Sequence, residues 1–299
     1  MERARPGQHG PGAPQTPRTP QAQQSQGAQQ APPTLLTEYA DGVATLVLHN
    51  PAKRNAMTEA MWRELPGVLS ALADDTSVRV LVVTGAENTF CAGADISTLR
   101  HSVESSQGLA VAAEEALSAF PKPTLAAVRG HCVGGGAQLA AACDLRFAAQ
   151  GSLFGVTPAK LGIVYPASST QRLVRLVGPS TAKYLLFSGE LIDADRALRT
   201  GFVDEVHPQE GLDERVGVFT RTLVERSQLT QAAAKEFTRS TVDASRTEYW
   251  RRVAAESGEA AEGAAAFMER RSPHFRWTPG PESPEGPKNA QSPEGPANP

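Results

Sequence analysis

Hydrophobic and polar positions follow two different spacings along the chain, and each change of spacing marks a predicted element. Two β-rich runs, residues 35–39 and 43–49, flank the dipeptide Asp41-Gly42, a combination that favours a tight hairpin. Thr58 can then cap a helix whose apolar residues recur at helical spacing. These residues are Met61, Leu65, Val68, Leu69 and Leu72, with Pro66 among them. The sequence thus predicts a hairpin followed by a helix that packs against a sheet.

The next part of the chain alternates between strand and helix patterns. Residues 79–84 contain the continuous apolar run Val80 to Val83, typical of a strand buried on both faces, and residues 123–128 are a second such strand. Helical patterns lie near residues 108–120 and 134–142, so parallel β-α-β units are expected. Beyond Pro179 the pattern is almost wholly helical. The predicted helices there are 182–187, 194–200, 212–226, 231–240 and 248–268.

Composition narrows the functional classes. The formal charge is −3 and the basic residues form no long run, so nothing indicates a nucleic-acid or membrane-surface partner. Cys91, Cys132 and Cys143 match no zinc spacing, and their odd number argues against a secreted disulfide scaffold. No stretch has the apolar length of a membrane span. We therefore expect small-molecule chemistry, without a metal, in a reducing cytoplasm.

Both ends of the chain differ in composition from its body. Residues 1–33 are rich in Pro, Gln and Gly, and residues 279–299 repeat Ser-Pro-Glu-Gly-Pro at Ser283 and Ser292. Such segments bury too little apolar surface to offset the entropy of ordering. We predict two disordered tails around an α/β core at 34–225 and a helical region at 226–278.

Two segments of small residues follow the predicted buried strands. Residues 90–96 read Phe-Cys-Ala-Gly-Ala-Asp-Ile, and residues 130–138 read Gly-His-Cys-Val-Gly-Gly-Gly-Ala-Gln. Each lies at the carboxyl edge of a sheet, where α/β folds bind ligands, and the second opens a helix whose first N–H groups are unpaired. Alone, the first segment is better explained as an ordinary glycine turn, and the three glycines of the second are weak evidence of a site. Neither has the spacing of a phosphate-binding loop or a dinucleotide fingerprint.

Together with Asn50-Pro51 and residues 53–56 upstream, these segments resemble the enoyl-CoA hydratase/isomerase (crotonase) superfamily. The resemblance extends from about Leu35 to Trp277, through residues 170–173 and 187–197. It implies a spiral of β-β-α units with a helical C-terminal trimerisation region, hence a homotrimer or hexamer. It also implies a lyase of fatty acid metabolism whose coenzyme A enters as part of the acyl-CoA substrate, with no separate cofactor.

The resemblance also assigns roles to residues. The N–H groups of Ala94 and Gly135 fall on the family's oxyanion hole, which holds a thioester enolate. A basic pair, Lys53 and Arg54, could meet the CoA phosphates, although solvated surface charge explains it equally well. The remaining expected substrate contacts are Ala92, Asp95, Ile96, Ser97, Gly134, Thr157, Phe267 and Arg270.

The chain departs from the family where hydration needs its acid and base. The two glutamates that hydratases use fall on Gln138 and Pro158, and an aspartate of some isomerases falls on about Pro166. An amide can orient a water but cannot take its proton, and proline can do neither. Standard hydration by this pair is therefore not expected.

The loop at residues 154–165 suggests an alternative reaction. Its Thr157-Pro158 pair, followed by Leu-Gly and Tyr165, is similar to the methylmalonyl-CoA decarboxylase branch, although that branch can carry a histidine in place of Ala94. Decarboxylation of a malonyl-type thioester needs an oxyanion hole and a proton donor but no base, and Tyr165, assisted by Gln138, could donate. We take this as the first hypothesis. Hydration with a nonstandard base and a non-catalytic acyl-CoA-binding protein are the alternatives.

Overall fold

The computed structural model describes residues 32–95, 103–239 and 242–279. The tails predicted at 1–33 and 279–299 lie outside these ranges, apart from residues 32, 33 and 279. In the part of the chain that is described, no helix is long and apolar enough to cross a membrane.

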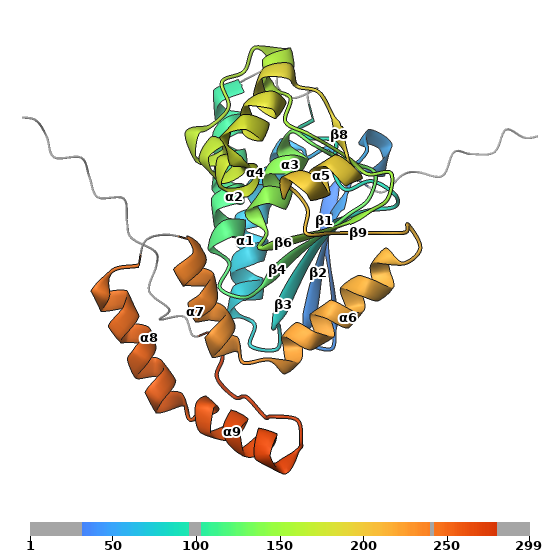
Figure 1. The fold of residues 1–299 in the computed structure, drawn as a ribbon. Helices are drawn as coiled ribbons and strands as arrows, with labels where there is room; N and C mark the ends of the chain where they lie inside the picture. The colour runs from blue at the N-terminus through green and yellow to red at the C-terminus, as the bar shows by residue number, and fades with distance from the viewer. Residues whose placement is uncertain (1–31, 96–102, 240–241, 280–299) are drawn as a thin grey trace, which may run out of the picture. The chain divides into compact units, whose positions relative to one another are not determined.

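A six-stranded sheet forms the centre of the fold, in the order β1-β2-β3-β4-β6-β9 (Figure 1). The predicted hairpin is confirmed: β1 and β2 pair antiparallel, and Asp41 and Gly42 both have positive φ, as a tight hairpin turn requires. All later pairs are parallel. The strands are β1 (Thr34–Ala40), β2 (Val43–His49), β3 (Val80–Gly85), β4 (Thr124–Val128), β6 (Leu145–Ala149) and β9 (Glu205–His207).

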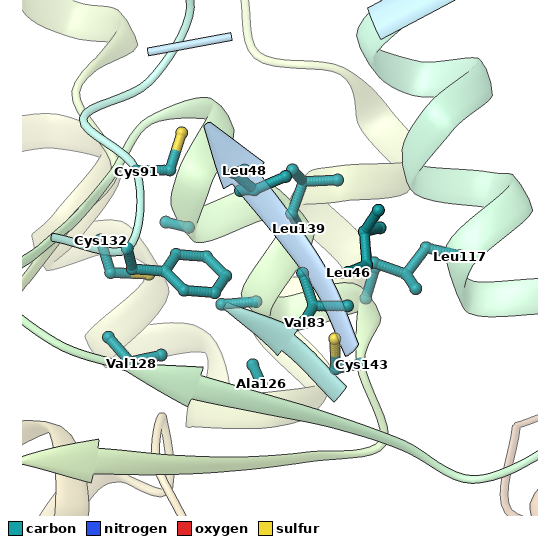
Figure 2. Packing of buried hydrophobic residues seen from close by; sticks show 14 of the residues in the cluster. Leu46, Leu48, Val83, Cys91, Leu117, Ala126, Val128, Cys132, Leu139 and Cys143 are labelled. Carbon is teal, nitrogen blue, oxygen red and sulfur yellow. The ribbon is translucent and has the colours of Figure 1, made fainter. Parts of the chain in front are cut away.

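The faces of this sheet carry two separate apolar clusters, as alternation along a strand demands. On β4, Leu125 joins Phe147 and Leu212 in the cluster beneath α6, whereas Ala126 and Val128 join the main core. Figure 2 shows this main core, with Leu46, Leu48 and Val83 from the sheet beside Leu117 and Leu139 from helices. The helices of this region are α1 (Glu59–Asp74), α2 (Val103–Ala119), α3 (Gly135–Ala142) and α6 (Leu212–Glu225).

A second, smaller sheet has three strands in the order β5-β7-β8. Its strands are β5 (His131–Val133), β7 (Leu153–Gly155) and β8 (Ile192–Asp193). Residues 90 and 91 run parallel to β5, since Cys91 N donates to His131 O and Val133 N donates to Cys91 O. The two segments of small residues therefore lie side by side.

The C-terminal part is largely helical, as predicted. One prediction there is wrong: residues 248–268 are not a single helix. Gly258 has φ +72°, a left-handed conformation that ends one helix and begins the next. The helices are α4 (Ala167–Ser188), kinked at Gly178, then α5 (Ala194–Thr200), α7 (Gln228–Arg239), α8 (Ala244–Ser257) and α9 (Glu259–Glu269); two short 3-10 turns are η1 (Pro51–Lys53) and η2 (Pro158–Leu161).

Helix α1 begins at its predicted cap, because the Thr58 hydroxyl accepts from Met61 N at 3.3 Å. Its exposed Gly67 has an ordinary helical φ, and a methyl there would meet nothing within 4 Å. Gly67→Ala is therefore expected to raise the free energy of unfolding by about 0.5–1 kcal/mol, measured by urea denaturation, because alanine loses less backbone entropy on folding.

Gly151→Ala is the matched control for this prediction. Position 151 is equally open, but its φ is +80°, which a side chain disfavours. This variant should be destabilised. Equal effects at the two glycines would contradict the conformational explanation.

Candidate functional site

The Ala94 amide is held at the carboxyl edge of the sheet by its neighbours. Met57 N donates to Gly93 O, and Asp95 N donates to Met57 O, both at 2.8 Å. Met57 thus bonds to the residues on either side of Ala94, which is the pattern of a parallel bridge. In this pattern Ala94 itself makes no bond to Met57, and its N–H points to the other side of its segment. Ala94 N–H therefore points away from Met57, and among the described residues it has no acceptor.

The Gly135 amide opens helix α3. Gly134, with φ +55°, is the N-cap, and its own N–H donates to Gly155 O at 2.8 Å. The first N–H groups of a helix have no intrahelical acceptor and carry partial positive charge. Within the described ranges, Gly135 N–H likewise has no partner.

The two amides lie close together, in a packed region where neither Gly93 nor Gly135 leaves room for a larger side chain. A methyl on Gly135 would lie 3.5 Å from Ala94 N, and one on Gly93 would lie 3.7 Å from Gly135 N. A methyl on Gly135 would also come within 2.8 Å of the buried Trp62 ring. Gly93, at φ +116°, has a conformation that glycine alone tolerates well. Two neighbouring backbone donors without acceptors among the described residues are what the predicted oxyanion hole requires.

A cluster of polar side chains lies one helical turn beyond Gly135. Gln138 Nε2 lies 3.1 Å from Ser169 Oγ and 3.4 Å from Glu114 Oε2. The Ser169 hydroxyl donates to the same oxygen of Glu114. Arg172 binds the other oxygen of Glu114, and its second nitrogen lies 3.1 Å from Glu115 Oε1. Helices α2, α3 and α4 are thus joined through one carboxyl group.

Glu114 is the unusual member of this cluster, because its side chain is only 1% exposed. Burial raises the pKa of its carboxyl, and the Arg172 guanidinium and Ser169 hydroxyl partly oppose that rise. Tyr165 packs against the core nearby, and burial together with the Glu114 charge raises the pKa of its phenol. Tyr165 therefore stays protonated near neutral pH and can donate a hydrogen bond.

Sequence reasoning missed Glu114, Ser169 and Arg172 as site residues. A signal was present for the first: Glu114 stands between Ala113 and Leu117, on the apolar face of the predicted helix. A carboxylate on such a face must find buried partners. Those partners come from a segment more than fifty positions away, which helical periodicity alone does not indicate.

The predicted CoA-binding residues near the N-terminus form a compact group. Lys53 Nζ lies 2.7 Å from Asp95 Oδ2, with Lys53 half-exposed and Asp95 buried. Ala92 N donates to the carbonyl of the exposed Arg54 at 3.0 Å. The basic pair is thereby fixed against the segment that carries Ala94. Its contact with CoA phosphates remains a prediction.

The other predicted substrate contacts lie in two places, beside the glycine turn and at the end of α9. A methyl on Gly134 would lie 3.9 Å from Thr157 Oγ1, so Thr157 borders the glycine turn. Phe267 is 83% exposed at the end of α9, and Arg270 caps that helix with φ 55°. Their role stays a prediction. Ile96 and Ser97 lie outside the described residues.

The three thiols are buried in the core (Figure 2). Burial raises the pKa of Cys91 and of Cys143 to about 12, and raises that of Cys132. A protonated thiol is a poor nucleophile and a poor metal ligand. In the described ranges no three His, Cys, Asp or Glu residues are grouped as metal ligands.

Comparison with known proteins decides the family. The sequence model for enoyl-CoA hydratase/isomerase matches residues 38–278. The chain belongs to this family. It is 34% identical over 256 residues to a 2,3-dehydroadipyl-CoA hydratase of Escherichia coli, covering 81% of this chain and 98% of that one. It is 33% identical over 259 residues to a crotonyl-CoA hydratase of Syntrophomonas wolfei, with coverages of 81% and 97%.

Solved structures agree with this assignment. A crystal structure of an enoyl-CoA hydratase/isomerase family member superposes with a TM-score of 0.78 at 36% identity, covering 84% of this chain and all of that one. An enoyl-CoA hydratase from Bacillus anthracis superposes with a TM-score of 0.77 at 29% identity, with coverages of 81% and 98%. The crotonase fold expected from the sequence is confirmed. This family member carries Gln138 and Pro158 where the hydratase glutamates were expected.

Proposed function

We propose that this protein is a lyase that adds water to the double bond of an enoyl-CoA thioester through an enolate. The observation that supports the proposal is the proximity of the Ala94 and Gly135 amides, neither of which has an acceptor among the described residues. An enolate places its negative charge on the thioester oxygen, and two fixed N–H donors match that charge better than water would. The named relatives support hydration over other enolate reactions, since they are a dehydroadipyl-CoA hydratase and a crotonyl-CoA hydratase.

This proposal reverses the order of the hypotheses drawn from sequence. Decarboxylation was placed first because neither Gln138 nor Pro158 can take a proton. The buried Glu114 carboxyl changes that balance, because an ionisable group does lie against Gln138. Coenzyme A would enter with the substrate, and no separate cofactor is required.

Decarboxylation of a malonyl-type thioester remains the second candidate. Tyr165 favours it, since a protonated phenol close to Glu114 can donate to a carboxylate or deliver a proton after carbon dioxide leaves. That reaction would use the same two amides, because it too generates a thioester enolate.

The test is to incubate the full-length protein with crotonyl-CoA in isotope-labelled water, and separately with methylmalonyl-CoA. Mass spectrometry of the products distinguishes the reactions. Labelled 3-hydroxyacyl-CoA is the expected result. Carbon dioxide loss without hydration would favour the second candidate, and acyl-CoA binding without either product would identify a non-catalytic homologue.

A further inference from the structure

Hydration requires a proton acceptor and a proton donor, and neither expected glutamate position can supply one. An ionisable group, Glu114, lies 3.4 Å from Gln138 Nε2. Resting on the proposed function, we propose that Glu114 is the proton-exchanging carboxyl of this acyl-CoA site, and that it acts through the Ser169 hydroxyl.

The placement of Gln138 connects Glu114 to the two amides. Gln138 follows Gly135 by three residues on α3, so both lie on one face of the helix, and helical side chains lean towards the N-terminus. The Gln138 side chain therefore reaches back towards the first turn. Since a carboxylate only accepts hydrogen bonds, the NH₂ group of Gln138 must face Glu114. Its carbonyl oxygen is then left to accept from a substrate water.

The bonds of Ser169 provide a path for the proton. Ser169 Oγ receives from Gln138 Nε2 and donates its own hydrogen to Glu114 Oε2. A proton that arrives at Ser169 Oγ can be passed on, because the hydroxyl hydrogen already points at the carboxylate. Arg172 holds the other carboxylate oxygen and fixes its orientation.

The groups around Glu114 set the pKa of its carboxyl. The charged and titratable groups facing it are Arg172 from α4, Glu115 from its own helix, and Tyr165 from the segment before α4. Beyond Tyr165 lies the Cys132 thiol of β5. Burial outweighs the Arg172 charge and raises the pKa of Glu114 above its ordinary value, which makes the carboxylate a stronger base.

The resulting step balances with one water. Water oxygen, oriented by the Gln138 carbonyl, bonds to the β carbon as one of its protons moves to the second lone pair of Ser169 Oγ and the Ser169 hydroxyl hydrogen moves to the Glu114 carboxylate. The electron pair of the double bond moves into the enolate, whose oxygen accepts hydrogen bonds from Ala94 and Gly135. The proton then returns from Glu114 to the α carbon, the thioester carbonyl re-forms, and the carboxylate is restored.

Glu114→Gln keeps the size and several hydrogen bonds of the side chain but cannot exchange a proton. It should lower the hydration rate by about 10²–10⁴-fold. It should lower the exchange of the α protons of butyryl-CoA in deuterium oxide by a similar factor. The wild-type rate should fall at low pH with an apparent pKa above that of an ordinary glutamate, and this limb should disappear in the variant.

Two further variants separate proton transfer from positioning. Glu115→Gln removes the half-exposed neighbouring carboxylate bound to Arg172; because the Glu114 carboxyl remains, exchange and hydration should persist, and only the low-pH limb should move to lower pH. Ser169→Ala removes the hydroxyl that would carry the proton but leaves the Gln138–Glu114 contact. Exchange of the butyryl-CoA α protons should therefore be lost if protons pass through Ser169. Thermal unfolding and butyryl-CoA binding show whether each variant keeps its fold.

The outcomes distinguish the two proposals. Hydration by the wild type together with full exchange by Glu114→Gln would overturn the role of Glu114 and leave the proposed function intact. Full exchange by Ser169→Ala with loss in Glu114→Gln would overturn the path through Ser169. A wild-type rate without a low-pH limb also contradicts the proposal, whatever the variants do. A wild type inactive on every thioester overturns the proposed function and the role of Glu114 with it.

Discussion

Gly135→Ala is expected to lower the hydration rate by about 10²–10³-fold, corresponding to about 3–4 kcal/mol of transition-state stabilisation, the typical effect of losing one oxyanion donor. The new methyl would lie 3.5 Å from Ala94 N, the second donor of the proposed oxyanion hole. Both amides would remain, but the substrate oxygen could no longer approach them together. Steady-state kinetics with crotonyl-CoA measures the effect.

The same methyl also meets the Trp62 ring at 2.8 Å, so overpacking should cost about 1–3 kcal/mol of folding stability. The double variant Gly135→Ala with Trp62→Phe separates the two effects. Phenylalanine removes the part of the indole that the methyl contacts, so stability should partly recover while the rate stays low. Recovery of the rate as well would mean that a displaced helix, and not a filled oxyanion hole, had caused the loss.

Arg172→Met is expected to destabilise the fold by about 3–5 kcal/mol, because it leaves the Glu114 carboxylate buried without its cationic partner. Arg172 holds the Glu114 pKa down against the effect of burial. Without it, the folded-state pKa rises further above the unfolded value. Stability is then kept at low pH, where Glu114 is protonated in both states, and is lost as pH rises through the raised folded-state pKa. Urea denaturation at several pH values measures this.

The double variant Arg172→Met with Glu114→Gln provides the control. Removing the carboxylate removes the charge that lacks a partner, so most of the lost stability should return and its pH dependence should disappear. A double variant as unstable as Arg172→Met alone would show that Arg172 supports the fold by packing and not through Glu114.

Patterns formed by residues close together in the chain were sufficient to predict most of the helices and strands. The hairpin at Asp41-Gly42, the Thr58 cap and the buried strands depend on turn chemistry, capping and periodicity, each set by residues close in the chain. The break between α8 and α9 was missed. A single glycine within a helical pattern is compatible with a continuous helix, and only its left-handed φ ends α8.

The two amides illustrate what the sequence by itself determined. Small residues after a buried strand and glycines before a helix made backbone N–H groups at Ala94 and Gly135 available, because backbone donors do not depend on distant partners. Only the tertiary structure decided which ionisable group lies against Gln138. Glu114 sits on a different helix from Gln138, Ser169 and Arg172, and folding buries these groups together, so that members of this cluster bind both of its carboxylate oxygens.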